Sequence, residues 1–432
     1  MQINIGILGL GTVGCGTVEV LRRNAALISE RSGCDLRVKH IATRTPGRAR
    51  AIEVAPELIS SDVERVLNDP EIHIVAELIG GVEPARDYVL RALKSGKSVV
   101  TANKELIAKH GPEIVLAAAR AGVDFRFEGS VGGGIPLVSP LRESLVANRI
   151  TQLMGILNGT TNYILTKMTR EGSDFNEVLA EAQSLGYAEA DPTSDVDGFD
   201  TMYKLQILAN SAFGVAIPIE EIYREGIRRV GARDIEYARE LGYIIKLIAL
   251  GRQDVNGQIE LRVHPALLPQ THPLASVHDV FNGVLMHGDA VGDVMFYGRG
   301  AGGEPTASAV VADIVEVARD IKAGAVGRVS EPSSSTQTSA FKPFADVETR
   351  FCVRMQVIDR PGMLAQIATT FGDKGVSLDS IVQKKSDGET AEIFWLTHRT
   401  SQRAMARSLN EFNRLDAVRE VSSVLRVEGE SN

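Results

Sequence analysis

The sequence predicts an α/β protein with three parts: a doubly wound parallel sheet, an α+β domain, and a C-terminal ferredoxin-like domain. Three observations lead to this prediction. Short apolar strands alternate with helical segments up to about residue 135, which is typical of a doubly wound sheet. Helical patterns dominate the next part of the chain. The last part, 349–432, has the order strand, helix, strand, strand, helix, strand, which is the ferredoxin-like βαββαβ order.

The length and composition are those of an ordinary globular protein. The 432 residues are enough for two or three domains, and 44% of them are hydrophobic and 24% charged. The net charge of −8 disfavours a nucleic-acid or anionic-membrane partner. The three cysteines show no zinc spacing, and no apolar run approaches the roughly 18 residues that span a membrane. We therefore expect a cytoplasmic protein without a membrane or nucleic-acid partner.

The elements of the first domain follow from the apolar pattern. A strand at 3–8 leads into a glycine-rich turn at 9–14, and a helix follows to about Ala26. Further elements are expected as strands at 36–43, 73–79, 97–102 and 123–130 and as helices around 84–95 and 112–121. A helix from Thr306 to about Ala323 is expected to return to this domain.

The glycine-rich turn has the spacing of a dinucleotide-binding fingerprint, GxGxxG, formed by Gly9, Gly11 and Gly14. It follows a strand and opens a helix, which is the context that makes this short motif informative. The glycines allow a tight turn and close approach of a pyrophosphate, which lies on the helix N-terminus. We therefore expect a Rossmann-type domain that binds NAD(P). A glycine-rich turn without a ligand is the alternative.

The residues around the second strand indicate which dinucleotide is bound. An NAD enzyme usually carries an acidic residue at the end of this strand, about 20 residues after the glycines. Asp35 has that spacing but precedes the strand, whereas Arg44 follows it, with Arg48 and Arg50 behind. An arginine there suits the 2′-phosphate of NADPH, so NADPH is favoured and NADH remains possible. The alternative is that Arg44 is only a solvated loop residue.

The second domain is predicted from a change of pattern after about residue 135. Helices are expected at 136–147, 158–170, 175–185, 198–213 and 233–250, and strands at 150–157, 258–268, 278–288 and 293–300. A Ser/Thr-rich stretch without periodicity predicts a linker. The expected domains are 1–135 with the returning helix at about 305–323, then 136–304, a linker at 324–348, and 349–432.

The stretch 188–209 combines five carboxylates with a lone lysine. Asp200 and Lys204 are four residues apart at the start of an apolar helix, so they share a helix face. An ammonium among carboxylates suits proton transfer and the binding of a cationic amino acid, and lysine can release its proton where arginine cannot. A calcium loop is one alternative, but its register puts Lys204 where the last glutamate ligand is needed. A solvated acidic loop is the other alternative.

Two further segments follow strands of the parallel sheet, at the edge where ligands bind. Lys104 follows the strand at 97–102 and is placed to meet a cofactor or substrate. Glu128 precedes a run of glycines that ends at Ile135, and one acidic residue with accessible carbonyls suits a hard cation. An exposed lysine at a helix start and a plain tight turn are the alternatives.

Six motifs make the chain resemble a known family over nearly its whole length. They are GLGTVG, TANK, EGSVGGGIP, NGTTNYIL, GYAEADPTSDVDGFD with its following lysine, and GAGGEPTASAVVADI. The chain resembles homoserine dehydrogenase of the monofunctional bacterial type, which has a C-terminal ACT domain. The resemblance implies NADPH-dependent reduction of L-aspartate 4-semialdehyde to L-homoserine, a step toward threonine and methionine.

The resemblance also implies a role for each matching residue. Lys204 would exchange a proton with the substrate oxygen, assisted by Asp200 and Lys104. The substrate would be bound by Glu189, Asp195, Asp200 and Lys104. The nucleotide would be held by Gly9, Gly11, Thr12, Val13, Gly14, Arg44, Lys104, Gly302 and Gly303. A structural sodium ion would be held by Glu128 and the backbone carbonyls of Val131, Gly133 and Ile135.

The tail resembles an ACT module. The turn from Asp359 to Gly362 leads from a strand into a helix, whose free N–H groups can bind a carboxylate. The resemblance implies threonine as effector, bound near Asp359, Gly362, Met363 and Leu364, and a homodimer or homotetramer. A tail that only dimerises is the alternative.

Two other functions stay open at this stage. A related semialdehyde dehydrogenase would need a nucleophilic cysteine, for which Cys15 and Cys34 are badly placed. A non-catalytic amino-acid sensor that keeps the nucleotide domain would not need Lys204, Asp200 and Glu189 in register.

Overall fold

A computed structural model describes residues 1–328, 340–386 and 388–429. By their internal contacts the residues form two compact units. Unit 1 comprises Met1–Leu153, Met202–Glu221 and Phe281–Thr338, and unit 2 comprises Met154–Thr201, Ile222–Val280 and Ser339–Asn432. This division differs from the expected domains, and the central part of the predicted linker, 329–339, lies outside the described residues. No helix in the described ranges is long and apolar enough to cross a membrane.

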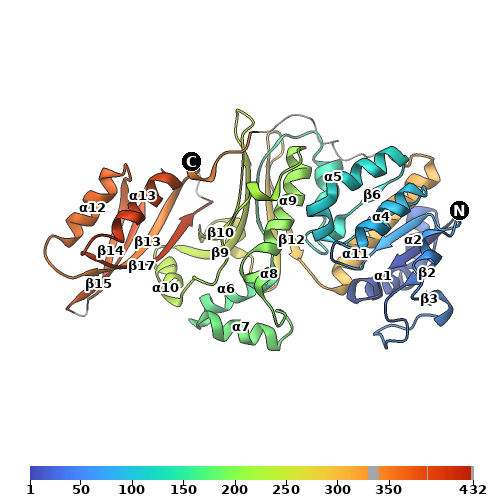
Figure 1. Ribbon diagram of the computed structural model, residues 1–432, viewed down its shortest axis with the longest axis horizontal. Coiled ribbons are helices and arrows are strands. Elements are labelled where there is room, and N and C mark those ends of the chain that lie inside the picture. Colours follow the sequence, from blue (N-terminus) through green and yellow to red (C-terminus); the bar gives the residue numbers. More distant parts are fainter. Residues whose placement is uncertain (329–339, 387, 430–432) are drawn as a thin grey trace. The chain divides into compact units, whose positions relative to one another are not determined.

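Unit 1 contains a six-stranded parallel sheet in the order β3-β2-β1-β4-β5-β6. Figure 1 shows this part of the chain, with β2, β3 and β6 labelled. The strands are β1 (Gln2–Leu8), β2 (Asp35–Ala42), β3 (Ile59–Ser60), β4 (Ile74–Glu77), β5 (Ser98–Thr101) and β6 (Phe125–Arg126). β4 and β5 are buried along their whole length, as expected when both faces of a parallel sheet are covered. The strand order reverses between β1 and β4, and doubly wound sheets bind ligands outside the carboxyl ends of the strands at such a point.

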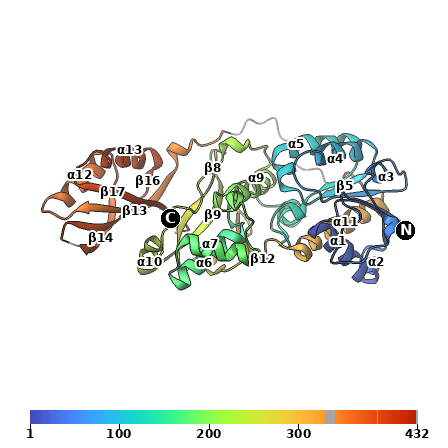
Figure 2. The same cartoon turned by 60° about the horizontal axis from the view of Figure 1, so that its bottom comes forward.

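Helices cover both faces of this sheet, with α1 and α11 on one face and α4 and α5 on the other (Figure 2). The helices are α1 (Thr12–Arg23), α2 (Ala25–Ser32), α3 (Glu64–Leu67), α4 (Ala85–Lys94), α5 (Lys104–Ala121) and α11 (Gly303–Ala323). α11 comes from late in the chain, yet its Val310 and Ile314 join the core formed by β1. A Cβ atom on Gly16 would lie 2.8 Å from the carbonyl oxygen of Gly303, so this glycine permits α1 and α11 to pack closely.

The other elements of unit 1 are short or lie in its later segments. They are the 3₁₀ turns η1 (Pro56–Leu58), η2 (Glu128–Ser130) and η4 (Ile219–Glu221), the π turn η3 (Pro140–Ser144), and the antiparallel hairpin of β11 (Phe281–Gly288) and β12 (Gly292–Arg299). β7 (Ile150–Ile156) and α9 (Phe199–Phe213) each begin in one unit and end in the other.

Unit 2 begins with helices and a long hairpin. The helices are α6 (Gly159–Glu171), α7 (Phe175–Ser184), α8 (Thr193–Val196), α10 (Ala232–Glu240) and the 3₁₀ turn η5 (Pro273–Ser276). The hairpin pairs β9 (Tyr243–Gln253) with β10 (Ile259–Pro269), and the short β8 (Tyr223–Arg224) runs parallel to β10.

The C-terminal part of unit 2 has the expected βαββαβ order. Its elements are β13 (Glu348–Ile358), α12 (Met363–Asp373), β14 (Leu378–Ser386), β15 (Thr390–Thr397), α13 (Gln402–Phe412) and β17 (Val418–Val427), with the turn η6 (Phe344–Asp346) and the short β16 (Thr400–Ser401). Phe351, Phe371 and Trp395 are fully buried in its core. β17 also pairs in parallel with β10, so this sheet continues into the β9–β10 hairpin.

The predicted helix at 233–250 is wrong after Glu240. The chain turns at Gly242, whose φ of 81° is in the left-handed region, and then forms β9. The run that follows contains the β-branched residues Ile244, Ile245 and Ile248, which favour strands. A continuous apolar run does not by itself distinguish a buried strand from a buried helix.

Three other expected elements have different bounds. The helix expected at 112–121 begins eight residues earlier at Lys104, because Asn103 accepts a hydrogen bond from the N–H of Leu106 (3.1 Å) and caps it there. The strand expected at 123–130 is limited to β6 and followed by η2, and the helix expected at 136–147 is only the turn η3.

Candidate functional site

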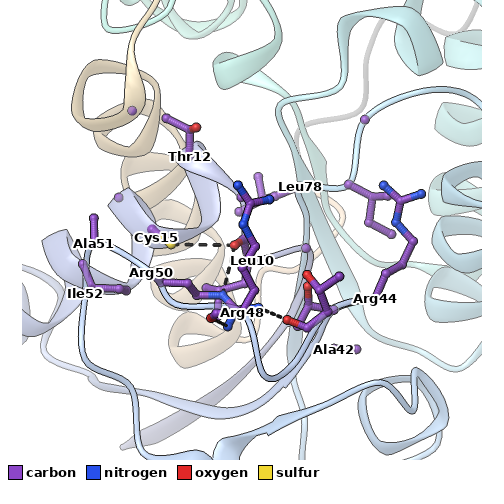
Figure 3. Close-up of a pocket in the computed structure, with 18 of the residues that line it drawn as sticks. Leu10, Thr12, Cys15, Ala42, Arg44, Arg48, Arg50, Ala51, Ile52 and Leu78 are labelled. Atoms are coloured by element: carbon purple, nitrogen blue, oxygen red, sulfur yellow. Dashed lines mark hydrogen bonds between the residues drawn. The ribbon is translucent and has the colours of Figure 1, made fainter.

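A cavity of about 1240 Å³ lies in unit 1 beside the carboxyl ends of β1, β2 and β4 (Figure 3). It is lined by the glycine-rich turn after β1, the loop after β2, the loop after β4 and the first residues of α11. This is the crevice next to the reversal of strand order, where doubly wound sheets bind nucleotides.

The glycine-rich turn has the geometry that its spacing predicts. Gly9 has a φ of 103°, and a Cβ atom on Gly14 would lie 2.3 Å from the carbonyl oxygen of Gly9, so neither position accepts a larger residue without a shift. Gly11 precedes Thr12, the first residue of α1. The unpaired N–H groups at the start of this helix provide a site for a pyrophosphate.

The predicted cofactor-binding residues divide into two groups. Those that line the cavity are Gly9, Gly11, Thr12, Arg44 and Gly303. Those outside the lining are Val13, Gly14, Gly302 and Lys104. Val13 packs against the hydrophobic core, and Gly302, with a φ of 127°, caps α11. Lys104 is the first residue of α5.

Arginines from the loop after β2 line the cavity, namely Arg44, Arg48 and Arg50 (Figure 3). The Arg50 guanidinium donates hydrogen bonds to the carbonyl oxygens of Thr45 (2.6 Å) and Arg48 (2.6 Å), and Nε donates to that of Leu10 (3.4 Å). Arg50 thus ties the arginine-bearing loop to the glycine-rich turn.

Asp35 lies away from this cavity. It is the first residue of β2, at the end opposite to Arg44, and it pairs with Arg37 (2.8 Å). The carboxylate that an NAD enzyme places at the carboxyl end of this strand is therefore not supplied by Asp35.

In unit 2, one asparagine joins two residues of the acidic stretch. The side-chain Nδ2 of Asn158 donates hydrogen bonds to Asp195 Oδ1 (2.7 Å) and Asp200 Oδ2 (2.9 Å). Its Oδ1 accepts from the N–H of Thr161 (2.8 Å) as the N-cap of α6, which fixes the direction in which Nδ2 points. The sequence did not predict this role for Asn158, although an asparagine between a strand and a helix is a recognisable N-cap signal.

The other carboxylates of the stretch have separate surroundings. Asp197 pairs with Arg228 (2.5 Å), and Asp191 accepts a hydrogen bond from the N–H of Thr193 (3.0 Å). Glu189 is exposed. The stretch is therefore not a uniform acidic loop, because Asp195 and Asp200 share a hydrogen-bond donor, whereas Asp197 pairs with an arginine and Glu189 is exposed.

Asp200 and Lys204 both lie in α9, four residues apart as predicted. Both are buried, with 2% and 8% of their surface exposed. Residues at this spacing share one helix face, and ionisable side chains are rarely buried so deeply unless they are paired or functional.

The predicted metal ligand Glu128 has a defined structural role. Its carboxylate accepts hydrogen bonds from the N–H groups of Leu137 (2.6 Å), Val138 (3.0 Å) and Ser139 (2.6 Å), which closes the loop after η2. Three of the roughly four acceptor positions of this carboxylate are thus used by backbone N–H groups, and Oε2 accepts only the bond from Ser139. The other predicted ligands are the backbone carbonyls of Val131, Gly133 and Ile135. The described residues contain no cluster of three or more His, Cys, Asp or Glu side chains suited to a metal.

In the C-terminal domain the predicted effector residues lie on an exposed turn. Asp359 and Gly362 are exposed, and Gly362 precedes α12 with a φ of 90°. Leu364, in the first turn of α12, is 43% exposed, whereas Met363 packs against the core.

Family patterns match three parts of the chain. The pattern described as homoserine dehydrogenase matches residues 136–315, and that of the homoserine dehydrogenase NAD-binding domain matches residues 9–128. The pattern of the ACT domain matches residues 353–417.

Whole-length relatives agree with these matches. Homoserine dehydrogenase from Synechocystis is 46% identical over 99% of this chain and all of its own length, and that from Bacillus subtilis is 42% identical over 99% of this chain and 98% of its own. The crystal structure of a homoserine dehydrogenase from Thiobacillus denitrificans is 46% identical, covers 99% of this chain and 98% of its own, and gives a TM-score of 0.93. A hyperthermophilic archaeal homoserine dehydrogenase mutant, solved in complex with NADPH, is 30% identical over 73% of this chain and 98% of its own, with a TM-score of 0.61.

Proposed function

Because this chain belongs to the homoserine dehydrogenase family and is an NAD(P)-dependent oxidoreductase, we propose that Lys204 transfers the proton in its reaction. The carbonyl carbon of L-aspartate 4-semialdehyde gains a hydride and its oxygen gains a proton, which gives L-homoserine. The nicotinamide cofactor supplies the hydride. The observation that carries the proposal is the burial of Lys204 in α9, four residues after the buried Asp200.

The remaining roles follow from the charges involved. The Lys204 ammonium donates a proton to the substrate oxygen as the hydride arrives, and the amine accepts it back in the reverse reaction. The substrate carries an ammonium group, so Asp200 and Glu189 are proposed to bind it. Asn158 holds Asp195 beside Asp200, which supports a positioning role for Asp195. Lys104 is proposed to contact cofactor and substrate.

Two substitutions at one position test the proton transfer. Lys204→Ala should lose most of kcat while NADPH affinity stays unchanged. Lys204→Arg keeps the positive charge but does not release a proton near neutral pH, so it should be nearly as inactive as alanine. Direct binding of NADPH by each variant reports that the nucleotide domain is intact. An active Lys204→Arg enzyme would refute proton donation, because charge alone would then suffice.

We propose NADPH as the preferred cofactor. The proposal is supported by three arginines lining the cavity after β2 and by the position of Asp35 at the opposite end of that strand. An arginine at the carboxyl end of this strand accommodates a 2′-phosphate.

The cysteines disfavour a semialdehyde dehydrogenase that forms a thioester. Such an enzyme needs a thiolate, whereas burial raises the pKa of the Cys15 thiol and raises that of Cys352 to about 12. Cys34 is buried in the hydrophobic core of unit 1. None of the three therefore has the environment of an activated nucleophile.

The structural sodium ion remains a proposal that rests on the resemblance, with Glu128 and the carbonyl oxygens of Val131, Gly133 and Ile135 as its ligands. No step of the reaction is assigned to it. Titrating sodium against potassium while following thermal unfolding tests it. A rise of the unfolding temperature with sodium alone supports the site, and equal effects of both ions contradict it.

We also propose that the ACT domain binds threonine at the turn before α12 and that bound threonine inhibits the enzyme. The enzyme is proposed to be a homodimer or homotetramer. Leu364→Pro removes one N–H group from the first helical turn, where proline is tolerated, and Leu364→Ala keeps it. Inhibition should weaken in the proline variant only. Equal inhibition in both variants would place the effector elsewhere.

A further inference from the structure

We propose that Glu77 is a positioning residue for this reaction, because it fixes both the loop that lines the cofactor cavity and the helix start that carries Lys104. The inference rests on the proposed function. The residues whose contacts carry it lie within unit 1. Glu77 does not line the cavity, so its role is exerted through the groups that it holds.

The first set of contacts involves the loop after β4. Glu77 is the last residue of β4 and its surface is 0% exposed. Its Oε1 accepts hydrogen bonds from the N–H groups of Ile79 (2.8 Å) and Gly80 (3.4 Å). Ile79 and Gly80 line the cavity together with Leu78. The carboxylate therefore fixes the backbone conformation of residues that line the cofactor cavity.

The second set of contacts leads to α5. The Thr101 hydroxyl donates a hydrogen bond to Glu77 Oε2 (2.6 Å) and accepts one from the N–H of Asn103 (3.0 Å). The Asn103 side chain caps α5 and also donates to the carbonyl oxygen of Gly81 (2.6 Å). The contacts thus form a closed loop from β4 through β5 to α5 and back. Lys104, the next residue, is held at the start of that helix.

A purely structural role does not account for a carboxylate at this position. β4 and β5 pair in parallel, with Ile74, Val75 and Ala76 buried, and only their last pair, Glu77 and Thr101, joins a carboxylate to a hydroxyl. Burial raises the pKa of Glu77, so its ionised form is costly there. In the described part of the chain no lysine, arginine or histidine forms an ion pair with it. An apolar pair would join the strands at lower cost, but it would leave Ile79, Gly80 and Asn103 without their side-chain partners.

Two matched pairs of variants test the role. Thr101→Val removes the hydroxyl while keeping the size, and Thr101→Ser retains the hydroxyl. Loss of the hydroxyl in the valine variant should displace Lys104 by a fraction of an ångström and lower kcat about tenfold. The serine variant should retain most of the wild-type kcat. Because Thr101→Val leaves the bonds to Ile79 and Gly80 in place, the Kd for NADPH should change less than kcat.

The hydrogen bonds between Glu77 and the loop after β4 are tested by Glu77→Gln and Glu77→Ala. The glutamine variant can still accept from the loop N–H groups but presents an amide to Thr101, so it should resemble Thr101→Val. The alanine variant should also weaken NADPH binding. The proposal would be overturned if both Glu77→Gln and Thr101→Val kept a kcat within twofold of wild type and an unchanged Kd for NADPH. If Glu77→Gln does not fold, the Thr101 pair decides alone.

The experiment separates this inference from the proposed function. An inactive wild-type enzyme that binds NADPH would contradict the proposed function. In that case the Kd of Glu77→Ala for NADPH would still test whether Glu77 positions the loop after β4. An active wild type with unaffected variants would contradict only the role of Glu77.

Discussion

The side-chain amide of Asn158 donates a 2.9 Å hydrogen bond to the carboxylate of Asp200, 42 residues later in the chain. The same amide nitrogen donates to Asp195, while its oxygen caps α6. One side chain therefore starts a helix and fixes two carboxylates that are proposed to serve the substrate.

Asn158→Ser should separate these two tasks. Serine caps helices about as well as asparagine, so α6 should persist, but the two hydrogen bonds to carboxylates are lost. A hydrogen bond to a charged group contributes about 1.5–3 kcal/mol, so kcat/KM for the aldehyde should fall about tenfold or more. The KM for NADPH should not change. Unchanged kcat/KM in a variant of normal stability would show that Asn158 only caps the helix.

Arg44→Ala should raise the KM for NADPH about tenfold or more and leave that for NADH nearly unchanged, because only NADPH carries the 2′-phosphate. Arg37→Ala is the matched control, since Arg37 lies at the other end of β2 in an exposed ion pair. Steady-state kinetics with both nucleotides measure the ratio. Equal effects on the two cofactors would remove Arg44 from the phosphate site.

Glu428→Ala should destabilise the protein strongly. Glu428 is 3% exposed and accepts a 2.8 Å hydrogen bond from the fully buried Arg262, which joins the end of the C-terminal domain to β10. The variant leaves the Arg262 charge with the more distant carboxylate of Glu260 (3.6 Å), and removing one partner of a buried ion pair typically costs about 3–5 kcal/mol. Glu420→Ala, at an exposed position of β17, should cost less than about 0.5 kcal/mol. Denaturant unfolding compares the two, and similar losses would contradict this account.

Lys246 should make stability rise with pH. It is fully buried in β9, where Nζ donates to Asn162 Oδ1 (2.9 Å) and to the carbonyl oxygen of Val277 (2.6 Å), and burial lowers its pKa to about 7. Between about pH 7 and the unfolded value of 10.5, the unfolded chain binds a proton that the folded protein does not, so the free energy of unfolding increases with pH.

Lys246→Met removes the titratable amine and tests this pH dependence of stability. The difference in unfolding free energy between wild type and variant should shift in favour of wild type as pH rises through this window. Lys94→Met, at an exposed position of α4, serves as control. A difference that does not vary with pH would mean that Lys246 stays charged in the folded protein.

The sequence predicted the features that depend on local patterns. The GxGxxG turn, the parallel strands around it and the βαββαβ tail all follow from spacing and periodicity over a few residues, and the structure contains them. The spacing of Asp200 and Lys204 likewise follows from the helical repeat.

The features that the sequence did not reveal depend on contacts between distant segments. β9 has an apolar run that suits a helix equally well, and its pairing with β10 decides the outcome. Asn158 acquires its role from carboxylates 37 and 42 residues away, and Glu77 from a hydroxyl 24 residues away. A single sequence carries no signal for such pairings.

The most direct test of this account follows the oxidation of NADPH by the wild-type enzyme with L-aspartate 4-semialdehyde, with NADH in parallel and the product identified. The account predicts rapid oxidation, one L-homoserine formed for each NADPH consumed, and a higher kcat/KM with NADPH than with NADH. Folded protein that binds NADPH but oxidises neither nucleotide in the presence of the aldehyde would contradict it.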